Sequence, residues 1–259
     1  MKKTSLTGAL ITGAVFSALV AGSAMAADMT PKPAPMLMKA PMAPVYNWTG
    51  CYIGGGFGYG MWNQDNFLET DPGHVAITVT TTSGGRGWFG TAGAGCDYQV
   101  SSNIVIGAYG DWDFGNIKGQ FEPAGRNEVG TESEKWAWAV GGRIGWLVTP
   151  TVLTYFSGGY TQAHFDAIGL DSVFPGGIFP LNVGANTYNG WFLGSGFDYA
   201  VSILPSGFFL RSEYRYSTYQ AADLSIFRPT GVSFGEAINA KKYVQTVRSE
   251  LIYRFNWGH

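Results

Sequence analysis

An alternation of side chains with a period of two, from residue 48 onward, limits the possible folds more than any other property of the chain. Within residues 135–147 the intervening positions are small or charged, whereas the other face carries Trp136, Trp138, Val140, Ile144 and Trp146. Residues 104–114 repeat the pattern, with Ile104, Ile106, Ala108, Trp112 and Phe114 on one face. Successive side chains of a strand point to opposite faces, so the pattern predicts strands rather than helices. Apolar side chains outside and small or charged ones inside are typical of a membrane barrel.

Six further segments alternate in the same way, some less regularly. The eight predicted strands span residues 50–62, 87–98, 104–114, 135–147, 152–165, 188–199, 208–218 and 243–255. Short connections (100–103, 148–151, 201–206) alternate with long ones (63–86, 115–134, 166–187, 219–242). Because strands account for every regular segment, we predict an all-β fold. The even number of strands and the alternation of short periplasmic turns with long outer loops are typical of outer-membrane barrels. We expect an eight-stranded antiparallel up-and-down transmembrane β-barrel in the outer membrane, with both termini in the periplasm.

Composition supports a membrane barrel and excludes other classes. The mean hydropathy of +0.02 is high for a soluble chain, yet the best helical candidate, residues 136–148, is short and contains Arg143. Charged residues make up only 13% and the net charge is -2, which excludes a basic surface for nucleic acid. All nine tryptophans fall near predicted strand ends or in the tails beside them, as the aromatic girdles of a membrane protein require.

The first 47 residues predict export and a spacer. Lys2 and Lys3 precede an apolar stretch at residues 6–20, and Ala24-Met25-Ala26 forms a small-residue cleavage site. We expect a signal peptide at residues 1–26, cleaved between Ala26 and Ala27; an uncleaved anchor is the alternative. Residues 27–47 are rich in proline, alanine and methionine and predict an extended periplasmic linker. The barrel then occupies residues 48–259.

The lumen-facing positions hold equal numbers of acids and bases. The acids are Asp97, Asp111, Asp113, Asp198, Glu213 and Glu250, and the bases are Lys135, Arg143, Arg211, Arg215, Arg248 and Arg254. Paired carboxylates can perform acid–base catalysis. The interior of an eight-stranded barrel, however, is only wide enough for side chains. We therefore predict that these residues form ion pairs that fill the lumen.

The last hairpin predicts its own register. If Arg211 lies opposite Glu250, then Glu213 lies opposite Arg248. A slip by two residues would set Glu213 against Glu250 and Arg215 against Arg248. Like charges directly opposite are unfavourable, so we expect the first register.

Two cysteines, Cys51 and Cys96, lie at the predicted periplasmic ends of neighbouring strands and in the lipid-facing phase. Because the periplasm is oxidising, we predict a cross-strand disulfide, with two free thiols as the alternative. A zinc site is not expected there, since two cysteines without a nearby histidine cannot complete four ligands.

Two other features resemble a nucleotide-binding or a catalytic site, but each has a structural explanation. The glycines of residues 54–60 alternate with aromatic residues inside a strand, whereas a nucleotide-binding loop needs a following helix. Among the histidines, His74 falls in an outer loop, His259 is the last residue, and His164 lies two positions from Asp166. His164 and Asp166 form the one catalytic-looking pair, without an evident nucleophile. We expect no enzymatic activity, no cofactor and no metal.

The segment Trp48-Thr49-Gly50-Cys51-Tyr52-Ile53-Gly54 resembles the Trp-Thr-Gly-x-Tyr-x-Gly signature of a family of small barrels. Residues 95–99, 155–160, 213–216 and 247–255 are similar to further strands of this family, the RopB-type, opacity-protein-like outer-membrane proteins of alphaproteobacteria. The resemblance implies insertion by the barrel-assembly machinery, which reads an aromatic residue of the terminal strand. Candidates for that signal are Tyr253, Phe255 and Trp257. It also implies an envelope protein and surface antigen, in some members with haem-binding or porin-like activity.

Three functions follow as expectations. The first is an envelope-stabilising barrel that contacts outer-membrane lipids and lipopolysaccharide, with Arg126, Arg228, Lys241 and Lys242 as candidate phosphate contacts. The second is a small diffusion pore, although eight strands leave little free lumen. The third is capture of a ligand such as haem by the loops, with His74 or His164 as ligands. The oligomeric state is left open.

Overall fold

The computed structural model describes residues 47–122, 128–174 and 177–255. They form β1 (Gly50–Thr70), β2 (Thr81–Gln99), β3 (Ile104–Phe121), β4 (Glu128–Thr149), β5 (Val152–Phe165), β6 (Ile168–Phe174), β7 (Gly177–Val183), β8 (Asn186–Ala200), β9 (Phe208–Tyr219), β10 (Ala222–Phe227) and β11 (Ser233–Phe255). No helix within these residues is long and apolar enough to cross a membrane. The predicted signal peptide, cleavage site and most of the linker lie outside the described residues.

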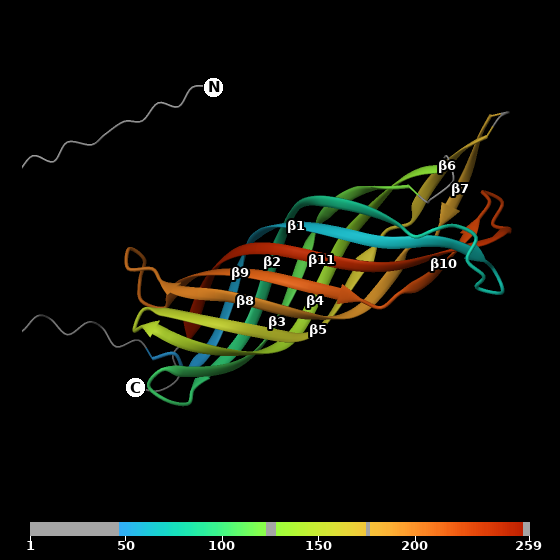
Figure 1. Cartoon of the computed structure of the whole chain (residues 1–259). Helices are drawn as coiled ribbons and strands as arrows, with labels where there is room; N and C mark the ends of the chain where they lie inside the picture. The colour runs from blue at the N-terminus through green and yellow to red at the C-terminus, as the bar shows by residue number, and fades with distance from the viewer. Residues whose placement is uncertain (1–46, 123–127, 175–176, 256–259) are drawn as a thin grey trace, which may run out of the picture. The chain divides into compact units, whose positions relative to one another are not determined.

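Eight of the strands close into a ring, in the order β1-β2-β3-β4-β5-β8-β9-β11 (Figure 1). The ring closes where β1 pairs antiparallel with β11, from Cys51 opposite Phe255 to Thr70 opposite Glu236. Closure satisfies the backbone groups that an open sheet would leave at its edges. The predicted eight-stranded antiparallel barrel is confirmed.

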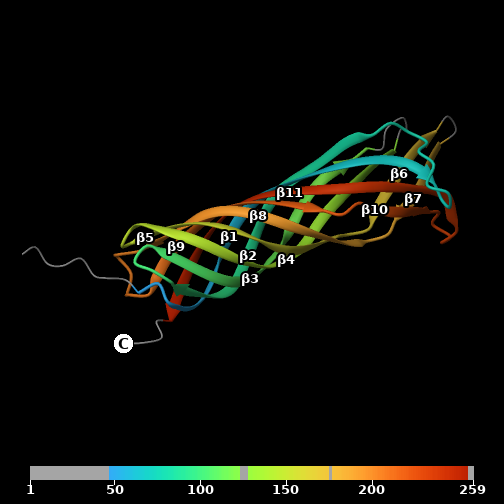
Figure 2. The same cartoon turned by 60° about the horizontal axis from the view of Figure 1, so that its bottom comes forward.

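The remaining strands extend this ring at one end. β6 pairs with β4 and β7, and β10 pairs with β7 and β11. Each of these short strands is separated from a long strand of the ring by only two residues: β6 from β5, β7 from β8 and β10 from β9. Each short strand therefore follows or precedes a long strand after a brief interruption. Figure 2 shows β6, β7 and β10 gathered at the same end of the barrel. We call this part the outer extension.

The prediction of four long loops was therefore largely wrong. Much of residues 63–86, 115–134, 166–187 and 219–242 is strand. The alternation continues there, and its inward positions pack into a separate apolar cluster that includes Leu68, Phe121, Ile168, Leu170, Leu181, Val183, Ile226 and Ile238. The predicted boundaries followed the end of the lipid-facing aromatic residues, whereas the strands are held together farther out by this interior cluster.

The outward and inward faces of the barrel wall carry the side chains that the alternation predicted, except for two of the tryptophans. Trp88, Trp112, Trp146 and Trp191 are exposed on the outside. Trp48 and Trp62, however, are fully buried inside the barrel and do not belong to a girdle. The indole of Trp48 contacts Phe209 (ring centroids 5.0 Å apart), and the indole of Trp62 donates to the carbonyl of Ile117 at 3.1 Å. The lumen thus contains aromatic side chains as well as the charged ones.

Candidate functional site: the charged interior of the barrel

Two aspartates and three arginines form the inner group of the lumen, toward the end of the barrel where Cys51 pairs with Phe255. Arg143 of β4 donates through Nε to Asp97 of β2 at 2.9 Å and through Nη1 to Asp198 of β8 at 3.1 Å. Arg211 of β9 donates to both oxygens of Asp198, at 2.8 and 2.9 Å. Arg254 of β11, also predicted to face the lumen, lies 2.7 Å from Asp97. All five side chains are buried, and the group joins five of the eight strands.

A second group lies farther along the lumen. Arg215 contacts Asp111 at 2.7 Å and Glu213 at 2.8 Å. Arg248 of β11 contacts Asp113 at 2.8 Å and Asp111 at 3.0 Å. The remaining member, Glu250, is more loosely held, 3.9 Å from Arg211 and 4.0 Å from Arg248. Asp111 and Asp113 lie on β3, so these contacts cross the lumen rather than following one hairpin.

The structure thus places eleven of the twelve lumen-facing residues predicted from the sequence inside the barrel, in these two groups. The register of β9 and β11 is the predicted one, with Arg211 opposite Glu250 and Glu213 opposite Arg248. The closest partners of Arg211 and Arg248, however, are Asp198 and Asp113, on other strands. The predicted lumenal position of Lys135 was wrong. It is half-exposed at an irregularity between β4 and β5 and pairs with Asp166 at 3.2 Å.

Aromatic rings separate the arginines. Arg143 and Arg211 both lie over the ring of Tyr52, 5.0 and 4.5 Å from its centroid. Arg215 lies 4.4 Å from the centroid of Phe192. Such stacking compensates part of the cost of burying a guanidinium. The cavity left between Asp111, Arg211, Arg248 and their neighbours measures about 10 Å³, roughly the space of a single water.

A third buried charge site lies farther out and was not found from the sequence. The ammonium of Lys242 lies 2.5 Å from Glu132, donates a further hydrogen bond to the amide oxygen of Gln64, and sits 4.0 Å from the ring centroid of Phe165. Lys242 was expected at the surface as a phosphate contact, and that expectation was wrong because its side chain is fully buried. The alternation along β11 would have predicted the inward position of the Lys242 side chain. Lys242 is an even number of residues from Arg248, which faces the lumen.

Burial changes the proton affinity of this outer site. Desolvation lowers the pKa of Lys242, an effect that the nearby Glu132 opposes. Desolvation, together with the charges of Asp113 and Glu132, raises the pKa of Glu134 to about 8. Burial therefore favours the protonated form of Glu134 at pH values where an exposed glutamate is ionised.

The predicted disulfide is present. Cys51 and Cys96 are directly opposite each other on β1 and β2, and their sulfurs are bonded. The bond crosslinks β1 and β2. It lies at the end of the barrel where Cys51 is also opposite Phe255 of β11.

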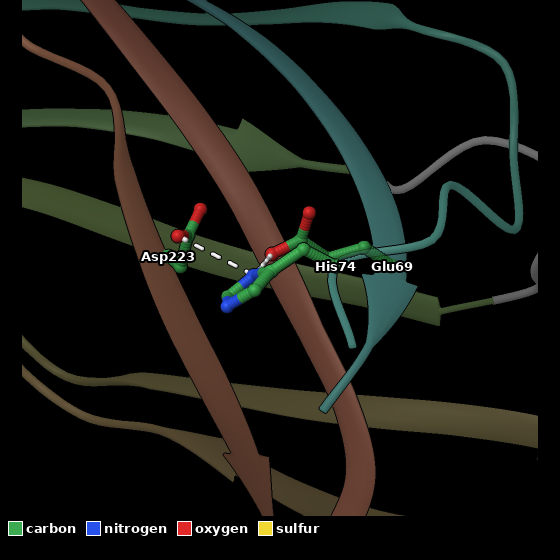
Figure 3. Close-up of side chains that lie close together, drawn as sticks. All are labelled: Glu69, His74 and Asp223. Carbon is green, nitrogen blue, oxygen red and sulfur yellow. Dashed lines mark hydrogen bonds and ion pairs between the residues drawn. The ribbon is translucent and has the colours of Figure 1, made fainter. Parts of the chain in front are cut away.

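The histidines occupy different settings. His164 stacks against the indole of Trp136 with ring centroids 5.1 Å apart, and its Nδ1 lies 2.9 Å from the hydroxyl of Thr187. Its Nε2 is 3.9 Å from Asp166, which is too long for a hydrogen bond. His74 instead lies beside Glu69 and Asp223 in the outer extension (Figure 3). His259 lies outside the described residues.

Comparison with known proteins identifies the family. The family model of the outer membrane protein beta-barrel domain matches residues 14–235, most of the chain. The chain belongs to this family. It is 29% identical over 252 residues to the 31 kDa outer-membrane immunogenic proteins of Brucella melitensis and Brucella suis, covering 93% of this chain and 98% of each relative. Among solved structures it resembles the outer membrane protein OprG from Pseudomonas aeruginosa, with a TM-score of 0.50, 12% identity, and coverage of 80% of this chain and 97% of that one.

As an outer-membrane barrel, the protein turns its exposed apolar side chains to lipid. They cover the wall from the disulfide end to an outer boundary marked by aromatic residues, among them Trp88, Trp112, Phe114 and Trp191. Immediately beyond that boundary, Arg86 of β2 lies directly opposite Lys118 of β3, and both are exposed. Aromatic side chains gather at the interfaces of membrane barrels, and on this criterion we assign the boundary as the outer limit of the membrane-spanning wall.

The candidate assembly signal is only partly described. Tyr253 and Phe255 close β11 on its outward face, with ring centroids 4.9 Å apart. Trp257 lies outside the described residues.

Proposed function

We propose that this outer-membrane barrel is a closed, non-catalytic protein that stabilises the cell envelope and contacts lipopolysaccharide, rather than a diffusion pore. The observation that carries the proposal is the continuous filling of the lumen. The inner group, the second group and the Lys242 site follow one another along the interior, and aromatic side chains occupy the space between them. An ion crossing the barrel would have to displace buried, paired arginines, which is costly.

The experiment is single-channel recording of the refolded full chain in a planar bilayer. We expect no steady conductance, because the internal cavity beside Arg248 holds about one water. A variant with a shorter side chain in the lumen, Arg248→Ala, serves as the comparison. Steady openings of the wild type that grow larger in Arg248→Ala would instead support the small-pore function and overturn the proposal.

The contact with lipopolysaccharide is proposed from Arg86 and Lys118. Like charges directly opposite each other on neighbouring strands are unfavourable, and the described ion pairs give neither residue a carboxylate partner. Aromatic belts mark the membrane interface, so the position of Arg86 and Lys118 just outside Trp88 and Trp112 supports a contact with lipid headgroups. A lipopolysaccharide phosphate would supply the missing negative charge through charge-assisted hydrogen bonds.

Floatation with vesicles tests this contact. We expect the double variant Arg86→Ala/Lys118→Ala to lose its preference for vesicles containing lipopolysaccharide over phosphatidylcholine vesicles. Arg228, named above as a candidate phosphate contact, follows β10 in the outer extension, beyond the aromatic boundary, and lies over the ring of Phe234. Arg228→Ala is therefore the matched control and should keep the preference. An unchanged preference in the double variant contradicts the proposal.

For assembly, we propose that the barrel-assembly machinery reads the terminal aromatic residues of β11. The outward positions of Tyr253 and Phe255 support this, since an exposed side chain at the strand end is accessible to a partner. Phe255→Ala and Trp257→Ala, made separately, should show by heat-modifiable gel migration from cell envelopes which residue is required. Full assembly of the double variant would overturn the proposal.

A further inference from the structure

A histidine and two carboxylates converge on the outside of the outer extension. Glu69 is near the end of β1, His74 lies in the turn between β1 and β2, and Asp223 belongs to β10. The Nδ1 of His74 lies 2.7 Å from Glu69 and 3.6 Å from Asp223, and one ligand atom from each residue falls within 4.8 Å of the others. Figure 3 shows the imidazole nitrogen facing both carboxylates.

The strand register explains why the two acids share a face. β11 lies between β1 and β10, so that Leu68, Ile238 and Leu224 are aligned and contribute to the interior apolar cluster. Asp223 and Glu69 occupy positions adjacent to that row, and alternation turns both to the opposite, outward face. Beside Glu69, β11 presents the small side chain of Ala237, which leaves room for the imidazole.

The charge balance at Glu69 calls for a cation. Its side chain is only 4% exposed, and a buried carboxylate is costly unless it is paired. The ion pairs of the described residues give Glu69 no lysine or arginine, only the imidazole of His74. An imidazole carries a positive charge only when protonated, and in its neutral form its nitrogen is a metal ligand.

The second acid is held in place by a neighbour. The amide of Asn239, opposite Asp223 on β11, donates to Oδ1 of Asp223 at 2.5 Å. That bond leaves Oδ2, the oxygen nearer to His74, available to another partner. Outer partners of this kind orient carboxylate ligands in metal sites.

We propose that Glu69, His74 and Asp223 bind a divalent transition-metal ion of the zinc type. One imidazole and two carboxylates make three protein ligands, which leaves a position open to water or to an external ligand. The mixed nitrogen and oxygen set favours such ions over calcium and magnesium, which prefer oxygen alone. Ligand atoms about 2.1 Å from a tetrahedral ion lie roughly 3.4 Å apart, close to the distance between His74 and Asp223. The contact between His74 and Glu69 must widen, which the exposed imidazole allows.

The test is calorimetric titration of Zn²⁺ into the untagged, refolded full chain, with Co²⁺ absorption as a second readout. We expect one saturable site per chain and the spectrum of Co²⁺ bound to nitrogen and oxygen ligands. His74→Ala, Glu69→Gln and Asp223→Asn should each weaken Zn²⁺ binding by about tenfold or more, and Asn239→Ala by about tenfold. His164→Ala is the matched control and should bind as the wild type does.

Three results would overturn the proposal. They are the absence of saturable Zn²⁺ binding by the wild type at micromolar concentration, unchanged binding in His74→Ala, and equal competition by Ca²⁺. Heat-modifiable migration of each variant verifies folding, and the Co²⁺ spectrum of the wild type tests the site without any variant.

Discussion

Glu213 of β9 lies directly opposite Arg248 of β11, and two residues along each strand Arg211 and Glu250 repeat the pairing with the charges exchanged. A slip of the hairpin by two residues would bring like charges together. The closest carboxylates to Arg248, however, are Asp113 and Asp111 on β3. This one guanidinium therefore serves both the register of a hairpin and the contacts across the lumen.

Exchanging the charges of this pair separates the two roles. Arg248→Glu should destabilise the barrel by about 3–5 kcal/mol, because it leaves Asp111 and Asp113 with fewer partners. The double variant Glu213→Arg/Arg248→Glu restores opposite charges across the hairpin but not the contacts with β3. We expect it to recover less than half of the loss in urea unfolding in lipid micelles. Full recovery would show that the cross-strand pair alone is responsible.

The disulfide should contribute measurably to stability. Cys51 and Cys96 are 45 residues apart in sequence, and a crosslink over a loop of this length typically stabilises by about 2–4 kcal/mol. Cys51→Ser/Cys96→Ser should therefore unfold at lower urea concentration than the wild type. Wild type treated with reductant under unfolding conditions should match the double variant, and a difference between the two would point to an effect of the serines.

Glu134 should make stability depend on pH. Its pKa, raised to about 8 by burial, exceeds the value of about 4.5 in the unfolded chain. The protonated form is the one that the fold favours, so this contribution is fully present below about pH 4.5 and is lost as the pH rises through about 8. Glu134→Gln should thus be more stable than the wild type at about pH 9 and similar at about pH 4. Parallel unfolding curves at both pH values test this, and an advantage of equal size at both would contradict it.

The outer extension should behave as a packed part of the barrel. Ile238 is fully buried in its apolar cluster, and truncation of such a residue costs about 2–5 kcal/mol. Ile238→Ala should therefore expose residues 63–86 and 219–242 to limited proteolysis. Val79→Ala, at an exposed position in the turn between β1 and β2, is the control and should leave the cleavage pattern unchanged. Loops without a common core would respond equally to both changes.

The alternation of side chains along short segments was sufficient to predict the strands and which face of each is turned inward. The alternation of Trp136 to Trp146 with small and charged residues identified the strands and their two faces, because a strand's side-chain phase depends only on its own residues. Cys51 pairs with Cys96 across the consecutive strands β1 and β2, and Glu213 pairs with Arg248 across β9 and β11, between which the chain forms only the short strand β10. These pairs join strands that are near neighbours in sequence, so the spacing of their residues predicted them.

Contacts between distant strands required the closed barrel. Arg143 reaches Asp97 and Asp198 on two other strands, and Lys242 turns inward to Glu132, because ring closure and strand tilt bring inward side chains of different strands to one level. The extent of the strands beyond the membrane depended on an interior cluster assembled from β1, β3, β6, β7, β10 and β11. The meeting of Glu69, His74 and Asp223 depended on β11 lying between β1 and β10. The order of residues along the chain therefore establishes the strands, their two faces and the charges they carry. Which of those side chains meet follows from the closed ring, because their contacts join segments that are distant in sequence until the barrel closes.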